Sequence, residues 1–294
     1  MNILSKKCLS LFSRLLFLLP RKVIRFLGSL LGVLWFDIFR FRRKIVLSNL
    51  QIAFPEMPES EKIKIGRRSV YELGSNFLEF FTLPALNQKW VRENAVYEGV
   101  EHIQNALKKD KGVYLLSMHI GHGDMGASLI SMLGVEVYLI SKFFKTKWFN
   151  DFWFYIRKGQ GVKFIEPHGL QTPFEILKAI KKKSSVIFVL DQFMGKPFGV
   201  PTLFFGKKTG TAYGLALFHL KTKSPVVPVY TYEGNDGKVH LVFEPELKLD
   251  EFISEDKDKT IAALTQNFTD QIEKIVRRYP EQWMWVHRRW KDID

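Results

Sequence analysis

The spacing of apolar and polar positions changes near residue 96. Before it, the pattern predicts helices over 9–19, 23–41 and 45–83; in the second of these, apolar residues recur at helical intervals. After it, short apolar runs alternate with helical patterns, which indicates a mainly parallel sheet flanked by helices. We therefore predict an α/β fold preceded by a helical lead-in.

The predicted strands are short apolar runs bounded by polar turns. They cover 113–118, 135–141, 162–166, 185–190, 225–231 and 238–244. The last is expected to be antiparallel, because Asn235-Asp236-Gly237 is a turn signal. The predicted helices cover 100–109, a segment from 125, one within 147–158, 173–183, 211–222 and 257–279. Thr172-Pro173-Phe174-Glu175 matches a capping box at a helix start.

The first 44 residues predict a membrane-anchoring helical segment. The run 9–19 carries Arg14 and ends at Pro20, and the longest charge-free stretch of the next run is 26–36. Both are short for a spanning helix, which needs about 20 mainly apolar residues. Basic residues on both flanks favour helices that lie in the interface of an anionic membrane, the alternative being a buried helical hairpin. No small-residue cleavage site follows, so we do not expect a signal peptide.

The pattern divides the chain in two. Residues 1–44 form the predicted anchoring segment, and 45–294 form the predicted enzymatic domain, with a helical lead-in at 45–95 and an α/β core at 96–294.

Composition narrows the class of partner. Lys and Arg number 44 against 30 Asp and Glu, a formal net charge of +14, which indicates an anionic partner such as nucleic acid, an anionic membrane or an acidic carrier. We find no nucleic-acid-binding module, and 26 Phe with 7 Trp favour a membrane surface. The single cysteine, Cys8, excludes an intramolecular disulfide.

Polar groups follow two predicted strands. His119 follows the strand 113–118, with Asp124 five positions later where a helix begins, and Asp191 follows the strand 185–190. Ligands of α/β sheets bind outside the carboxyl ends of the strands, and Arg157 is expected at the same edge. We expect His119 to act as a general base and Asp124 to accept a hydrogen bond from its other ring nitrogen.

Other interpretations of this site remain open. The sequence has no G-x-S-x-G nucleophile elbow, so the dyad would activate a hydroxyl of the substrate. A metal-dependent hydrolase would use His119, His122 and Asp124, with Asp191 or His287, although the spacing matches no usual zinc motif. Asp124 could also simply cap its helix. A third interpretation is a membrane-binding scaffold without activity.

The segment 143–157 combines large aromatic side chains with lysines. Part of it belongs in a core. The rest suits a lipid-facing lip or a pocket for an acyl chain.

Taken together, these residues resemble the lipid A biosynthesis (lauroyl/myristoyl) acyltransferase family, within the lysophospholipid acyltransferase superfamily. The match begins with His119-x4-Asp124 after a strand and extends over nearly the whole chain. It includes Arg42-Arg43-x-Ile45-x3-Asn49-Leu50-x3-Phe54-Pro55, Arg68-Ser69-x-Tyr71-x2-Gly74-x4-Glu79-Phe80, Glu98-Gly99, Asp191-Gln192, Phe204-Phe205-Gly206 with Thr211, Gly214 and Ala216, Pro225-Val226-Val227-Pro228-Val229, and 281–291. Many members have Asn-Trp where this chain has His122-Gly123.

The resemblance implies a glycerol-phosphate-acyltransferase-like fold and an acyl-carrier-protein-dependent O-acyltransferase. The acyl chain would pass from the carrier's thioester to a hydroxyl of a lipid A precursor or related glycolipid. The enzyme would work at the cytoplasmic face of the inner membrane, without an acyl-enzyme, a cofactor or a metal. Another glycolipid or a lysophospholipid is the alternative acceptor.

The resemblance also implies roles for individual residues. His119 and Asp124 match the catalytic dyad. The substrate-binding positions are Arg157, Asp191, Gln192, Gly206 and Thr211. Arg157 would stabilise the oxyanion or hold the carrier's phosphopantetheine, and Asp191 would hold Arg157 or a substrate hydroxyl.

Overall fold

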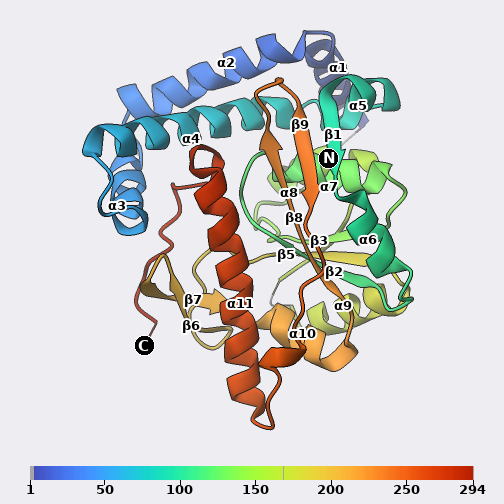
Figure 1. The fold of residues 1–294 in the computed structure, drawn as a ribbon. Coiled ribbons are helices and arrows are strands. Elements are labelled where there is room, and N and C mark those ends of the chain that lie inside the picture. Colours follow the sequence, from blue (N-terminus) through green and yellow to red (C-terminus); the bar gives the residue numbers. More distant parts are fainter. Residues whose placement is uncertain (1–2, 168, 294) are drawn as a thin grey trace.

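A computed structural model describes residues 3–167 and 169–293. Residues 1–2 of the predicted anchoring segment and residues 168 and 294 of the predicted enzymatic domain lie outside the described residues. Its centre is a seven-stranded sheet in the order β1–β9–β8–β2–β5–β3–β4 (Figure 1). Neighbouring strands run parallel except β8 and β9, which are antiparallel. The strands are β1 (Ala95–Glu98), β2 (Val113–Ser117), β3 (Val137–Ile140), β4 (Lys163–Ile165), β5 (Ser185–Val189), β8 (Val226–Glu233) and β9 (Val239–Phe243).

Helices pack on both faces of the sheet, and each face has its own apolar core. Alternate residues of β2 point to opposite faces. Tyr114 and Leu116 enter one core, and Val113 and Leu115 enter the other. The first core includes residues of α3 (Arg43–Ala53), α9 (Thr172–Lys181), α10 (Gly214–Thr222) and α11 (Lys257–Arg278). The second includes residues of α1 (Ile3–Phe17), α5 (Gln88–Asn94), α6 (Val100–Leu107), α7 (Gly123–Met132) and α8 (Lys147–Arg157).

The N-terminal helix α2 (Arg21–Val33) lies along α4 (Glu59–Phe80), as Figure 1 shows. Glycines let the two backbones touch, because a Cβ on Gly74 would lie 2.3 Å from the carbonyl oxygen of Gly28. Arg21 pairs with Glu79 at 2.6 Å and with Glu233 at 2.6 Å. Removal of either partner from a buried ion pair of this kind strongly destabilises the folded protein. One side of α2 is therefore fastened to the rest of the molecule.

The other side of the N-terminal helices exposes large apolar side chains. They belong to α1, to α2, to the turn between them and to the π-helix Leu34–Ile38 with its following turn: Leu11, Phe12, Leu15, Leu18, Leu19, Val23, Phe26, Leu27, Leu30, Leu31, Leu34, Ile38, Phe39 and Phe41. Within residues 3–167 and 169–293, no helix is both long and apolar enough to cross a membrane. The predicted run 23–41 is thus an α-helix that passes into a π-helix.

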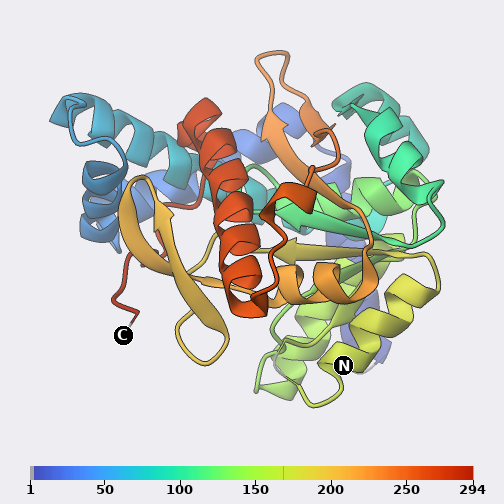
Figure 2. The same ribbon diagram turned by 60° about the horizontal axis from the view of Figure 1, so that its bottom comes forward.

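The structure differs from the sequence-based expectation in one hairpin that was missed and in one predicted helix cap that is wrong. The hairpin of β6 (Gly199–Phe204) and β7 (Lys207–Ala212) was not expected, because its glycines and Pro201 interrupt any strand pattern. The hairpin lies against α11 (Figure 2), and Gln266 of α11 accepts a hydrogen bond from the backbone of Leu203 at 2.8 Å. The capping box is also absent. Thr172 is the first residue of α9, and its hydroxyl donates instead to the carbonyl of Glu166 at 2.5 Å.

Of the predictions for the core, the fold class is confirmed, whereas the predicted helix 211–222 begins only at Gly214, because Thr211 and Ala212 belong to β7. The fold is α/β with a mostly parallel sheet flanked by helices, and β9 is antiparallel to β8 as the turn at 235–237 indicated. The strand β1 was missed, because its residues Ala95–Glu98 are all half-buried and do not alternate between apolar and polar.

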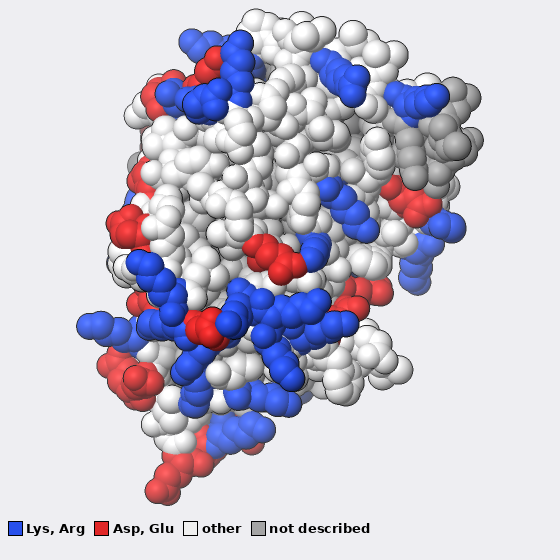
Figure 3. Space-filling model, turned by 90° about the vertical axis from the view of Figure 1, so that its right-hand side faces the viewer, with Lys and Arg blue, Asp and Glu red and all other residues white. Residues whose placement is uncertain are grey.

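Basic side chains gather where the parallel strands begin. The helix ends and turns that precede β2, β5 and β8 contribute exposed lysines: Lys108, Lys109, Lys111, Lys181, Lys182, Lys183, Lys221 and Lys223. Figure 3 shows a band of Lys and Arg across the lower half of that face, below a broad uncharged area. Two of these lysines are paired, Lys109 with Glu246 and Lys183 with Asp110. We call this band the lysine edge.

Candidate active site

His119 and Asp191 meet at the carboxyl edge of the sheet. They follow β2 and β5, which are parallel neighbours with Ser117 opposite Val189. His119 Nδ1 lies 2.8 Å from Asp191 Oδ1, and the backbone N–H of His119 donates to Asp191 Oδ2 at 3.0 Å. The sequence predicted that both side chains would reach this edge, and they do.

The expected bond between His119 and Asp124 is not formed. Asp124 Oδ1 instead accepts from Arg157 Nε at 2.7 Å, and Arg157 Nη1 donates to Ser141 Oγ at 2.6 Å. Asp191, which we expected to hold Arg157, forms its hydrogen bond with His119 instead. The reason is register: Asp191 leaves the neighbouring strand level with His119, whereas Asp124 lies inside the first turn of α7.

Asp124 is not the helix cap either. That position is taken by His122, whose Nδ1 accepts from the backbone N–H of Met125 at 3.3 Å.

The two groups of the His119–Asp191 pair stabilise each other's charged forms. Burial by itself would lower the pKa of His119, but the charge and hydrogen bond of Asp191 outweigh it, so the pKa lies above its usual value. Burial would raise the pKa of Asp191, but His119 and Trp283 hold it below its usual range. Asp191 is therefore ionised, and we assign the Nδ1 proton of His119 to the bond with it.

This tautomer makes Nε2 of His119 the acceptor, and the side-chain amide of Gln192 donates to it. The side chain of His119 is 40% exposed, and Nε2 lies 3.4 Å from Nε2 of Gln192. A substrate hydroxyl can therefore approach the ring nitrogen that takes a proton.

The C-terminal segment fastens the site. Trp283 Nε1 donates to Asp191 Oδ2 at 2.7 Å. The backbone of Met284 donates to the carbonyl of His119 at 3.0 Å, and Gly121 donates to that of Gln282 at 3.1 Å. Sequence reasoning used this segment only for family resemblance. Its density of tryptophan was the available sign that it lies in the core beside the site.

Two of the predicted substrate-binding residues make structural contacts. Thr211 is completely buried and accepts from Arg289 Nη2 at 2.6 Å. Gly206 occupies the tight turn between β6 and β7 with φ of 71°, a conformation that favours glycine. The side chain of Gln192, by contrast, reaches His119. Arg289, which the sequence analysis missed, is fully buried and also donates to the carbonyl oxygens of Gly210 and Gln192.

The structure does not assemble the metal site of the hydrolase interpretation. His122 uses Nδ1 for Met125, and His287 Nε2 accepts from the backbone of Phe193 at 3.4 Å. Among the residues described, no group of three or more His, Cys, Asp or Glu side chains could hold a metal ion. That interpretation loses the ligand set on which it depended.

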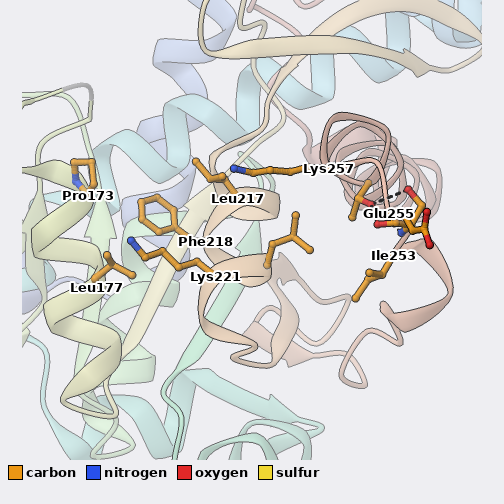
Figure 4. A pocket seen from close by; sticks show the side chains of 11 residues that line it. Pro173, Leu177, Leu217, Phe218, Lys221, Ile253, Glu255 and Lys257 are labelled. Carbon is orange, nitrogen blue, oxygen red and sulfur yellow. Dashed lines mark hydrogen bonds between the residues drawn. The ribbon is translucent and has the colours of Figure 1, made fainter.

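A cavity of about 600 Å³ lies away from these residues. It opens between α9, α10 and the start of α11, and Figure 4 shows Leu177, Leu217, Phe218 and Ile253 around it with Lys221 and Lys257. None of the predicted site residues lines it. It is a mainly apolar groove between helices and not the site at His119.

A histidine held by a buried carboxylate, at the carboxyl edge of a mostly parallel sheet, defines an α/β enzyme site that can deprotonate a substrate hydroxyl. The chain belongs to the bacterial lipid A biosynthesis acyltransferase family, whose model matches residues 9–292. The predicted family is therefore confirmed, and its class is acyltransferase.

Individual relatives agree with this assignment. The chain is 27% identical over 280 residues to the lipid A biosynthesis lauroyltransferase of Escherichia coli (strain K12), covering 93% of this chain and 87% of the relative. It is 24% identical over 281 residues to the lipid A biosynthesis palmitoleoyltransferase of the same strain, covering 93% and 86%. It is 24% identical over 226 residues to the phosphatidylinositol mannoside acyltransferase of Mycolicibacterium smegmatis (strain ATCC 700084 / mc(2)155), covering 76% and 71%.

Proposed function

We propose that this protein transfers a fatty acyl chain from an acyl carrier protein thioester to a hydroxyl of a lipid A precursor or a related glycolipid. The observation that carries the proposal is the 2.8 Å contact between His119 Nδ1 and Asp191 Oδ1, which makes Nε2 of the 40% exposed ring, 3.4 Å from Gln192 Nε2, the nitrogen that accepts a proton from a substrate. The family assignment supports the reaction class, and the names of the two relatives from Escherichia coli support lipid A as the acceptor.

In the proposed mechanism, Nε2 of His119 takes the proton of the acceptor hydroxyl. The resulting alkoxide attacks the thioester carbonyl carbon, so that an ester C–O bond forms and the C–S bond breaks. The imidazolium then returns its proton to the leaving thiolate. Asp191 positions the ring and stabilises its charged form, as carboxylates do beside catalytic histidines. A general base of this kind contributes roughly 10²–10⁴-fold to the rate.

Arg157 is proposed to stabilise negative charge on the substrate. Its guanidinium is fixed on two sides, by Asp124 at 2.7 Å and by Ser141 at 2.6 Å. Preorganised donors of this kind stabilise charge that develops in the transition state. Asp124 therefore acts mainly by holding Arg157, and its charge adds to that of Asp191 in raising the pKa of His119.

The proposed location is the cytoplasmic face of the inner membrane, with α1 and α2 lying in the interface. The exposed apolar side of these helices supports this location, because a surface patch this large favours contact with a partner or membrane. Exposed Lys22, Arg40, Arg42 and Lys44 border the patch and suit an anionic leaflet.

The acceptor has one named competitor. The mycobacterial relative acts on a phosphatidylinositol mannoside by its name, so a related glycolipid is the second candidate. Mass spectrometry of membrane glycolipids with and without the gene separates the two. The acceptor is the lipid whose mass differs by one acyl group.

Transfer is tested with purified protein, an acyl carrier protein thioester and a lipid A precursor. His119→Ala is expected to lower the rate about 10²-fold or more, because the base is lost. His102→Ala, on the surface helix α6, is the matched control and should keep the rate. Full transfer by His119→Ala would contradict the mechanism. Transfer to neither glycolipid by the unaltered protein would contradict the proposed function.

A further inference from the structure

An aromatic cluster connects α1 with the start of α8. We call it the aromatic lip, and its members are Phe12, Phe81, Phe144, Trp148, Phe149 and Phe152. Ring centroids lie 5.7 Å apart for Phe12 and Phe81, 6.3 Å for Phe81 and Phe152, and 6.4 Å for Phe149 and Phe152. The lip is therefore continuous over segments that are distant in sequence.

The outer members of the lip face solvent. Trp148 is 68% exposed, and Phe12 is 46% exposed. Phe12 also belongs to the apolar side of α1 and α2, so the lip extends that surface toward α8. A tryptophan beside phenylalanines at the border of an apolar surface is typical of a membrane interface.

The charges around the lip are mainly positive. Exposed Lys142, Lys145 and Lys147 lie in the segment that carries Phe144 and Trp148, and exposed Lys7 and Arg14 lie on α1. Lys147 pairs with Asp151. Each unpaired basic group close to an anionic leaflet adds to the attraction between the lip and the membrane.

The lip leads toward Arg157 and the candidate active site at the carboxyl edge of the sheet. Trp148 is nine residues before Arg157 on the same helix, which corresponds to about 14 Å along its axis. Inner rings continue the path, since Phe143 packs on Phe154, which packs on Phe164, and Arg157 lies 4.5 Å from the Phe164 ring. A bilayer at the lip would therefore hold lipid headgroups close to the level of Arg157.

We propose that the aromatic lip inserts into an anionic lipid leaflet as a second contact beside α1 and α2, and thereby sets the height of the active site above the membrane. The proposal rests on the proposed function only for the identity of the substrate. Insertion itself needs neither donor nor acceptor.

The principal competing occupant is a second copy of this chain. Exposed aromatic rings also form dimer interfaces, but the lysines around the lip would repel an identical basic surface. The same lysines attract an anionic leaflet. Charge complementarity therefore favours lipid.

Insertion is measured with a fluorophore whose emission depends on polarity. Because Cys8 is the chain's only cysteine, Cys8→Ser provides a background for Trp148→Cys, labelled with the fluorophore. Vesicles of zwitterionic and anionic phospholipid are added, with and without a quencher in the acyl region. We expect a blue-shifted emission and quenching at position 148.

The matched control is Leu203→Cys in the same background. Leu203 is 54% exposed on β6, whose hairpin packs against α11 far from α1 and α8 (Figures 1 and 2). Its label should not respond to vesicles. In unlabelled protein, Trp148→Ala should weaken vesicle binding about tenfold, Trp148→Phe should restore most of it, and Leu203→Ala should leave it unchanged.

Three results would overturn the inference. The first is a label at 148 that stays in water while the protein is bound to vesicles. The second is a label already buried in lipid-free protein of dimeric mass, which would identify a second copy as the occupant. The third is equal quenching at 148 and 203. A failure of the proposed function looks different, because insertion would then be intact while no acyl chain is transferred.

Discussion

At the scale of single residues, His119 and Asp191 determine how the activity depends on pH. The base must be neutral, and Asp191 raises the pKa of His119 once burial is offset. The rate should therefore rise with pH through a pKa above the usual value of about 6.5. Asp191→Asn removes the negative charge that raises the pKa of His119. The rising limb of the pH–rate profile should therefore move to lower pH, and the rate should fall about 10²–10⁴-fold.

A pH profile of kcat/KM for both proteins checks this. Asp124→Asn is the matched control, because its carboxylate holds Arg157 and raises the pKa of His119 less than Asp191 does. It should lower the rate with a smaller shift of the limb. A shift of the limb as large as that of Asp191→Asn would contradict the assignment of Asp191 as the main carboxylate that acts on His119.

Two glycines of the same loop should differ in their tolerance of substitution. Gly121 has φ of 56°, and a Cβ there would lie 2.2 Å from the carbonyl oxygen of Thr231. Gly121→Ala should therefore lower the free energy of unfolding by about 2–4 kcal/mol. Gly123 has no atom within 4 Å of such a Cβ and begins α7. Gly123→Ala should change stability by less than about 0.5 kcal/mol. Thermal unfolding followed by circular dichroism distinguishes the two, and equal losses would contradict the structure of the loop.

At the scale of elements, α2 combines a fastened side with an exposed apolar side. Ile24 is buried, and Phe26 faces solvent. Ile24→Ser should destabilise the protein by about 2–4 kcal/mol, since it leaves a cavity and buries a hydroxyl. Phe26→Ser should leave the unfolding temperature nearly unchanged and weaken binding to anionic vesicles, because apolar area that contacts the lipid is lost.

Unfolding curves and vesicle sedimentation of the two variants check this prediction. Unchanged vesicle binding by Phe26→Ser would mean that this side of α2 contacts something other than lipid. A stable Ile24→Ser would mean that α2 is not packed on α4.

At the scale of the whole molecule, the lysine edge and the candidate active site lie at opposite ends of the sheet. The lysine edge lies where β2 and β5 begin, whereas His119 and Asp191 lie where they end. Five residues of β2 alone separate these ends by about 17 Å. We expect the proposed carrier to dock at the end that holds His119, where exposed Lys196 lies four residues after Gln192 and exposed Arg288 directly follows His287.

Charge reversal tests this placement. Lys196→Glu with Arg288→Glu should raise the KM for the acyl carrier donor several-fold and make it less dependent on salt, because steering by opposite charge is lost. Lys182→Glu with Lys223→Glu is the matched pair on the lysine edge, with the same change in net charge. It should leave that KM within about twofold. A larger effect of the second pair would place carrier docking at the lysine edge.

The sequence by itself determined the α/β class of the fold and the edge of the sheet that His119 and Asp191 reach. Apolar runs of strand length predicted the mostly parallel sheet, and the turn at 235–237 predicted the antiparallel strand β9. His119 and Asp191 were expected at one edge because residues that follow parallel strands share an edge. These features depend on local pattern and chain direction, which are written in the order of residues.

The tertiary structure alone decided which groups bind each other. Asp124 is five residues from His119, yet Asp191 holds the histidine, because strand order and register bring β5 beside β2. The same is true of Trp283 on Asp191 and of Arg289 on Thr211, which are joined across 92 and 78 residues. The β6–β7 hairpin likewise depends on α11 and not on its own sequence pattern. Spacing along the chain fixes which edge a side chain reaches, and only the packing of distant segments fixes its partner.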